Sequence, residues 1–287
     1  MAQTLYPPAG PQSVGQVLDS GFRIFRISLV SCLLYGALSM IAGQLPNIYF
    51  IATGRPLTSF GNGDPVWIAL YFVGMLASFV FWGAVLLRQW GLAIGERMSS
   101  GAAFRQSTRK LPAELGVCLI LAIVVVITLA VDALVLRMLG IAVIPQNYLS
   151  IGAVGLIVGI PFWYLCTPFV LAGVALLVDD LGPWRAFGYA LRLVRGNWWR
   201  TTTVATIAAI VLIVYYGVIL MIVGMMAPLL GATDLSSVSA LVAVSYVVLG
   251  SLGMPFMTAT WLALLGDLKV RREGVDLEQR VASIASA

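Results

Sequence analysis

Six long stretches of the sequence carry no charged residue, and they separate clusters of arginine and lysine that fall almost entirely on alternate connections. Each stretch has room for a helix of about 20 residues, which crosses a hydrocarbon layer roughly 30 Å thick. The uncharged stretches are 27–54, 65–87, 115–131, 138–178, 201–233 and 235–266. They predict membrane-spanning helices over 28–51, 66–87, 113–136, 151–177, 203–229 and 238–265. The chain is therefore expected to be an all-α integral membrane protein, folded as a six-span helical bundle.

Low charge content places most of this chain in lipid. Of its 287 residues, 60% are hydrophobic and 10% are charged, and the mean hydropathy is +0.98. A soluble domain carries roughly 25% charged residues, so this composition would expose too much apolar surface to water. Histidine is absent, and Cys32, Cys118 and Cys166 lie in apolar runs without metal-binding spacing. We therefore expect no metal and no cofactor.

The basic residues fall on alternate connections between the predicted spans. If the amino terminus is cytoplasmic, 15 of the 17 lysines and arginines lie on the cytoplasmic side, and only Arg55 and Arg137 lie outside. Cytoplasmic loops of membrane proteins carry such an excess of positive charge. The pattern predicts both termini in the cytoplasm. It also indicates contact with anionic lipid headgroups, rather than nucleic acid, as the role of the positive charge.

Amphipathic segments precede the odd-numbered spans on this same side. Their apolar residues share one helical face, with arginine beside them; examples are Val14, Val17, Leu18, Phe22 and Phe25, and Trp184, Phe187, Ala190, Leu191 and Val194. Such helices lie at the membrane interface, where they support a span or bind a partner. The sequence predicts three repeats of an interfacial helix plus two transmembrane helices, approximately 13–97, 98–180 and 181–268. Residues 1–12 are expected to be an amino-terminal tail, and 269–287 a cytoplasmic carboxy-terminal tail, of a single membrane domain, 1–287.

Small residues and prolines in the spans predict where helices approach closely and where they break. Ser39 with Gly43, and Gly155 with Gly159, form pairs that allow close helix packing. Prolines in the fourth and sixth spans leave backbone carbonyls without amide partners in mid-membrane. Two interpretations stay open: neighbouring helices satisfy these carbonyls, or a cavity lies near the midplane. The residues expected to line such a cavity are Tyr164, Thr167, Pro168, Tyr215, Tyr216, Pro255 and Thr258.

Common catalytic and coupling motifs are missing from the sequence. No charged residue lies at the centre of a predicted span, whereas ion-coupled transport usually needs one. The phosphate-binding motif GxxxxGK[ST], the zinc motif HExxH and the nucleophile motif GxSxG do not occur. Asp179 and Asp180 are adjacent, so on a helix they point apart and form a poor acid–base pair. We therefore expect a protein that is not an enzyme.

Three motifs together resemble one bacterial membrane family. They are Val14-Gly-Gln-Val-Leu-Asp19 with Phe22-Arg23, then Arg195-Gly-Asn-Trp-Trp-Arg200, and then the segment from Asp267 to Glu278. The chain resembles the membrane domain attached to some bacterial glycerophosphodiester phosphodiesterases, and its stand-alone relatives of unknown function. That family typically has an aromatic residue before the aspartate and arginine at 269, where this chain has Gly266 and Lys269. The resemblance implies a six-span bundle in a bacterial inner membrane. It does not imply phosphodiesterase activity, which belongs to a separate barrel of roughly 250 residues.

Two functional hypotheses follow. In the first, the protein is a non-enzymatic inner-membrane scaffold or regulatory protein, whose cytoplasmic amphipathic helices and basic residues bind lipid headgroups and an unidentified protein partner. The residues expected on this interaction surface are Arg195, Asn197, Trp198, Arg200, Asp267, Arg271 and Arg272. In the alternative, the protein is a small transporter, or a channel for lipids or peptides, with a pathway along the proline-broken even-numbered spans. A water-filled cavity would favour the transporter, and a packed centre would count against it.

Overall fold

The structure is a computed structural model that describes residues 5–53, 64–138, 159, 166–229, 231 and 235–274. Across these ranges the regular secondary structure is helical, without strands, as expected for an all-α protein. Five helices are long and apolar enough to cross a membrane: Val14–Thr53, Pro65–Ile94, Ser100–Met138, Trp198–Leu229 and Ala240–Glu273. This set of helices is compatible with a multi-pass membrane protein.

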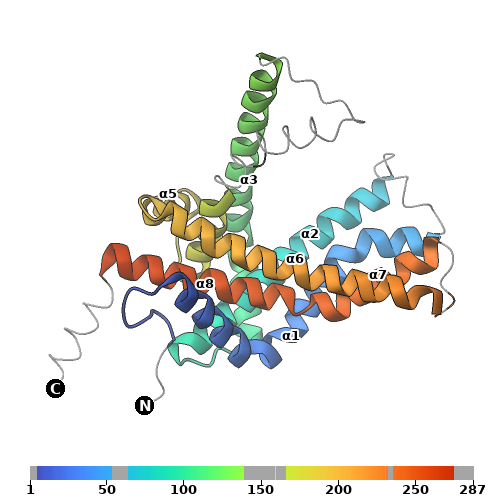
Figure 1. Cartoon of the computed structure of the whole chain (residues 1–287), viewed down its shortest axis with the longest axis horizontal. Helices are drawn as coiled ribbons and strands as arrows, with labels where there is room; N and C mark the ends of the chain where they lie inside the picture. The colour runs from blue at the N-terminus through green and yellow to red at the C-terminus, as the bar shows by residue number, and fades with distance from the viewer. Residues whose placement is uncertain are drawn as a thin grey trace. The chain divides into compact units, whose positions relative to one another are not determined.

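Seven of the helices are labelled in Figure 1: α1 (Val14–Thr53), α2 (Pro65–Ile94), α3 (Ser100–Met138), α5 (Pro183–Val194), α6 (Trp198–Leu229), α7 (Leu235–Gly250) and α8 (Gly253–Glu273). The chain divides into two compact units. Met1–Leu111 together with Thr203–Ala287 is here called the terminal unit, and Pro112–Thr202 the middle unit. The single membrane domain expected from the sequence stays a prediction.

The fourth predicted span, 151–177, lies mostly outside the described residues. Its last part forms a short apolar helix, Cys166–Val178. The count of six spans therefore stays a prediction, as do the threefold repeat and the orientation of the termini.

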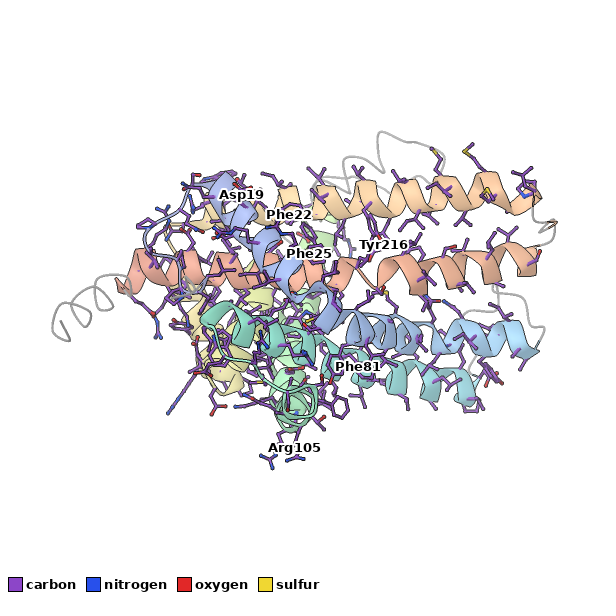
Figure 2. The ribbon with its side chains drawn as sticks, turned by 90° about the horizontal axis from the view of Figure 1, so that it is seen from below. Asp19, Phe22, Phe25, Phe81, Arg105 and Tyr216 are labelled. Atoms are coloured by element: carbon purple, nitrogen blue, oxygen red, sulfur yellow. The ribbon has the colours of Figure 1, made fainter. Side chains whose placement is uncertain are left out.

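The first predicted interfacial segment and the first span form one helix. α1 runs from Val14 to Thr53 without interruption, and Figure 2 shows that its amino-terminal part, with Asp19, Phe22 and Phe25, runs obliquely to the rest. α3 likewise joins the second interfacial segment to the third span. Only α5 is separate from the span that follows it. The reason lies in Gly196, which has a φ of 85°, a left-handed conformation that favours glycine and ends a helix.

α8 forms the centre of the terminal unit. Nearly every residue between Pro255 and Val270 is buried. A helix that is covered on all sides needs other elements around it. α1 and α2 pack against α8, and the rings of Phe22 and Phe256 are 5.1 Å apart between centroids. The fully buried leucines of α8 are Leu262, Leu264, Leu265 and Leu268.

The sixth predicted span is broken between α7 and α8, at Ser251 and Leu252. Pro255 lies in the first turn of α8, so it has no N–H for the Ser251 carbonyl oxygen four residues earlier. That oxygen lies against Gly36 of α1, where a Cβ atom would overlap it. The missing side chain of Gly36 therefore lets α1 reach the broken backbone.

Close helix contacts in the terminal unit occur at glycines that the small-residue pairs do not include. Besides Gly36, Gly74 of α2 makes such a contact, because a Cβ atom there would overlap the Ala42 carbonyl oxygen of α1. Gly43, in contrast, has no atom within 4 Å of a Cβ position, so it is not a contact glycine. Ser39 does lie at the contact with α2, and its carbonyl oxygen accepts the Ser78 hydroxyl at 3.3 Å.

A buried polar junction links α1, α2 and α8. The side chain of Gln89 in α2 is fully buried, and its Nε2 donates to Ser28 Oγ of α1 at 3.2 Å and to the Pro255 carbonyl oxygen of α8 at 2.7 Å. The Ser28 hydroxyl in turn donates to the Phe25 carbonyl oxygen at 3.1 Å. Because buried polar groups are costly without partners, these bonds restrict how the three helices sit together.

Candidate functional site

The residues 5–12 form a strap that packs against α2 and α8. The backbone N–H groups of Leu5 and Tyr6 both donate to the Ala93 carbonyl oxygen near the end of α2, at 2.7 and 3.2 Å. The Tyr6 side chain is only 6% exposed. From residue 5 onward, the predicted amino-terminal tail is therefore a packed part of the terminal unit.

Gly266 and Lys269 of α8 both lie against the Tyr6 ring. A Cβ atom at Gly266 would lie 2.9 Å from Tyr6 Cε2, so the ring occupies space that a side chain at 266 would need. Lys269 Nζ lies 5.8 Å from the centre of the same ring, within range of a cation–π interaction. The Tyr6 ring thus holds the strap against α8.

Asp267 is a fully buried carboxylate beneath the strap. Its Oδ1 accepts the backbone N–H of Gln12 at 2.7 Å, and its Oδ2 accepts Nε–H of Arg271 at 3.1 Å. Arg271 Nη2 donates to the Gln12 carbonyl oxygen at 2.6 Å. A buried charge is tolerated only when it is paired and hydrogen-bonded, so this ion pair holds the strap on α8. Asp267 and Arg272 were both predicted to lie on an interaction surface. In the structure Asp267 is buried, whereas Arg272 is exposed.

The outer face of α5, in the middle unit, combines tryptophan with arginine. The buried face consists of Ala186, Ala190, Leu193 and Val194. Trp184 and Leu191, expected on that apolar face, instead lie outside it and are 74% and 43% exposed. Arg185 and Arg192 are exposed beside them. No acidic residue occurs between positions 181 and 233, so this face carries positive charge alone.

The turn from α5 to α6 is built on Asn197. Its N–H donates to the Val194 carbonyl oxygen at 2.8 Å, and its carbonyl oxygen accepts the N–H and the hydroxyl of Thr201, each at 2.9 Å. Trp199 is 78% exposed, and its ring makes a T-shaped contact with that of Trp198 at 4.6 Å. A hollow of about 330 Å³ at this turn is lined by Gly196, Asn197, Trp198, Trp199 and Arg200.

This turn brings together the predicted interaction residues that lie between positions 195 and 200. Asn197, Trp198 and Arg200 line the hollow, and Arg195 is exposed immediately before it. Asp267, Arg271 and Arg272 belong to the terminal unit, at the end of α8. The interaction residues predicted from the sequence are therefore divided between the two units.

The residues predicted to line a midplane cavity also divide between the units. Thr167 and Pro168 belong to the middle unit, Tyr215, Tyr216, Pro255 and Thr258 belong to the terminal unit, and Tyr164 lies outside the described residues. Thr167 is buried, and Pro168 follows it in the helix Cys166–Val178. Thr258 is fully buried, and its hydroxyl donates to the Met254 carbonyl oxygen at 3.0 Å.

Two tyrosines of α6 donate hydrogen bonds to the last backbone carbonyl groups of α7. The Tyr215 hydroxyl donates to the Leu249 carbonyl oxygen at 2.6 Å, and the Tyr216 hydroxyl donates to that of Gly250 at 3.4 Å. Figure 2 shows Tyr216 between α6 and the break that separates α7 from α8. The Tyr216 ring also stacks on that of Tyr246 at 5.2 Å. These side chains serve helix packing at the broken span.

Replacing Tyr215 with phenylalanine is expected to destabilise the protein by about 0.5–1.5 kcal/mol, because one hydrogen bond to the end of α7 is lost. Thermal unfolding of the detergent-purified protein measures the change. Tyr246→Phe is the matched control, because within the described part of the chain the Tyr246 hydroxyl makes no hydrogen bond. Equal effects of the two substitutions would contradict the role given to Tyr215.

The docking of the strap on α8 was not predicted from the sequence. Its anchor joins Gln12 to Asp267 across 255 positions of sequence, and nothing local in residues 5–12 indicates that contact. One signal was available: Ser13-x-x-Gln16 has the spacing of a helix-capping box, which separates the preceding residues from α1.

Comparison of the chain with protein-family models, with curated proteins and with solved structures finds no match. The resemblance to the phosphodiesterase-associated membrane family therefore stays a prediction from the three motifs.

Proposed function

We propose that this protein is a non-enzymatic scaffold or regulatory protein of the bacterial inner membrane, with both termini in the cytoplasm. The observation that supports this best is the exposed basic and aromatic surface of the middle unit. It is called the α5–α6 surface here and consists of the exposed Trp184, Arg185, Arg192, Arg195 and Trp199, with the half-buried Arg200 beside them.

The composition of the α5–α6 surface suits both a membrane edge and a protein partner. Tryptophan is favoured at headgroup depth, and arginine pairs with lipid phosphates. Tryptophan and arginine are also the residues that contribute most to protein–protein binding. In this proposal, Trp184 and Arg185 lie against anionic headgroups, while the hollow beside Trp199 and Arg200 receives a side chain of the partner.

The packing of the broken span favours this proposal over the transporter. A transport pathway along the sixth span would use the backbone carbonyls that the break releases. Here the Leu249 and Gly250 carbonyl oxygens accept tyrosine hydroxyls, and the Ser251 oxygen lies against Gly36. These interactions support the interpretation that neighbouring helices contact the backbone carbonyls that the break leaves without amide partners.

The double substitution Arg195→Ala with Arg200→Ala is expected to weaken partner binding about thirtyfold or more, as for hot-spot arginines. The experiment is affinity purification of the tagged protein in mild detergent, with identification of the proteins and lipids that copurify. A protein recovered in stoichiometric amount with the wild type, and lost from the double variant, would support the proposal.

Arg105→Ala is the matched control, because Arg105 is an exposed arginine of α3 that belongs to the terminal unit (Figure 2). Melting temperatures within about 2 °C of the wild type would show that both variants are folded. The proposal fails if the folded double variant retains every partner, or if a small molecule held inside the bundle copurifies instead.

A further inference from the structure

A groove of about 410 Å³ lies between the strap and the first turns of α1. Neither the scaffold nor the transporter hypothesis uses it. Its volume falls within the range of sites that bind small molecules, roughly 300–1,000 Å³. The strap contributes Ala9, Gly10, Pro11 and Gln12, and α1 contributes Gln16, Asp19, Ser20 and Arg23.

Two sequence motifs from opposite ends of the chain build this groove: the first lines one wall, and the last anchors the strap that forms the other. Gln16, Asp19 and Arg23 come from the first motif, and their i, i+3, i+7 spacing places them on one face of α1. The strap wall is held by Asp267 and Arg271 of the last motif, through the backbone of Gln12. Both motifs thus contribute to a single groove.

The groove is held in shape by hydrogen bonds at its base. Gln12 Nε2 donates to Ser20 Oγ at 2.9 Å, which ties the strap directly to α1. Ser13 and Gln16 form a capping box, in which the Ser13 N–H donates to Gln16 Oε1 at 2.6 Å and the Gln16 N–H donates to Ser13 Oγ at 3.3 Å. A site whose walls are already fixed loses less entropy when a ligand binds.

The groove offers one negative and one positive group that do not pair with each other. Asp19 and Arg23 are exposed and one helical turn apart, and Figure 2 shows Asp19 near the start of α1. Opposite charges at this spacing attract each other only weakly, by about 0.2–0.5 kcal/mol. Within the residues that the structure describes, neither side chain forms an ion pair or a hydrogen bond. Both charges therefore stay available to a ligand.

We propose that this groove binds a zwitterionic group in which a primary ammonium stands next to a phosphate. The ammonium donates to the Asp19 carboxylate, and the phosphate accepts from the Arg23 guanidinium, so each charge of the ligand meets its opposite. A purely anionic ligand would be repelled by Asp19, and a purely cationic ligand by Arg23. This chemistry occurs in the headgroup of phosphatidylethanolamine and in soluble phosphoethanolamine.

The test uses the full-length chain, purified in detergent and stripped of lipid. Native mass spectrometry measures retention of phosphatidylethanolamine, phosphatidylglycerol and phosphatidylcholine, and calorimetry measures binding of O-phosphoethanolamine. We expect preference for phosphatidylethanolamine, because the glycerol headgroup lacks an ammonium and the choline ammonium has no N–H to donate. Asp19→Asn and Arg23→Gln should each weaken binding about tenfold to a hundredfold, as expected for a lost charge-assisted hydrogen bond.

Arg26→Gln is the control, because Arg26 is exposed on α1 but does not line the groove. Loss of lipid binding alone in the two groove variants assigns the ligand to the bilayer, and loss of phosphoethanolamine binding assigns it to the solution; either supports the zwitterion site. Equal retention of the three lipids with no binding of phosphoethanolamine would overturn the proposal. So would groove variants that melt and bind like Arg26→Gln.

Discussion

Replacing Asp267 with alanine is expected to lower the free energy of unfolding by about 2–3 kcal/mol, as for lost hydrogen bonds to a charged group. The substitution leaves the Arg271 guanidinium without its carboxylate partner and the Gln12 N–H without an acceptor. The hydrogen bond lost at Gln12 accounts for most of this cost, because Asp267 is fully buried, whereas the Arg271 side chain is 29% exposed and keeps contact with water. Thermal unfolding in detergent should show a melting temperature lower by roughly 10 °C.

The release of the strap should be visible separately from the loss of stability. With Asp267→Ala, the backbone N–H groups of Leu5 and Tyr6 are expected to exchange with solvent faster, because their bonds to Ala93 depend on a docked strap. Arg272→Ala is the control, since Arg272 is an exposed neighbour on α8 and surface substitutions usually change stability by less than about 0.5 kcal/mol. Similar melting temperatures for the two variants would show that the Asp267–Arg271 pair does not hold the strap.

Replacing Gly36 with valine is expected to destabilise the protein by about 3 kcal/mol. Even one added carbon atom would overlap the Ser251 carbonyl oxygen, so α1 would have to move away from the break between α7 and α8. Backbone adjusts less readily than the end of a flexible side chain, which places this substitution at the costly end of overpacking changes.

Gly43→Val is the matched control for this contact. Gly43 lies in the same helix, and no atom stands within 4 Å of its Cβ position. Its replacement should change the melting temperature little, since only helix propensity is affected. If Gly43→Val proves as costly as Gly36→Val, then the close approach at Ser251 is not what limits the size of residue 36.

Helices with a strong local signal could be predicted from the sequence. The uncharged runs indicated the long apolar helices because their length and composition are properties of the local chain. α5 was recognised from its spacing of apolar residues, and its start at Pro183 follows the preference of proline for the first helical turn. The side that packs could not be predicted, because a helical wheel does not show which neighbours cover Ala186 and leave Trp184 exposed.

Proline in the sixth span indicated a disturbed helix but not its form. A proline signals lost hydrogen bonding, which is compatible with a kink, a cavity or a break. In the tertiary structure the helix breaks before Pro255. The Ser251 carbonyl oxygen packs against Gly36, and the Tyr215 and Tyr216 hydroxyls donate hydrogen bonds to the last carbonyl oxygens of α7. Those partners lie on other helices, so the local sequence contains no information about them.

Long apolar helices, with basic residues clustered on alternate connections, could be inferred from the chain alone, because hydropathy and charge act through each residue's own preference for lipid or water. Three features emerge only when the helices are assembled: the central position of α8, the close contact at Gly36 rather than at Gly43, and the packing of residues 5–12 over Asp267. These features depend on groups far apart in the chain whose complementarity exists only after folding.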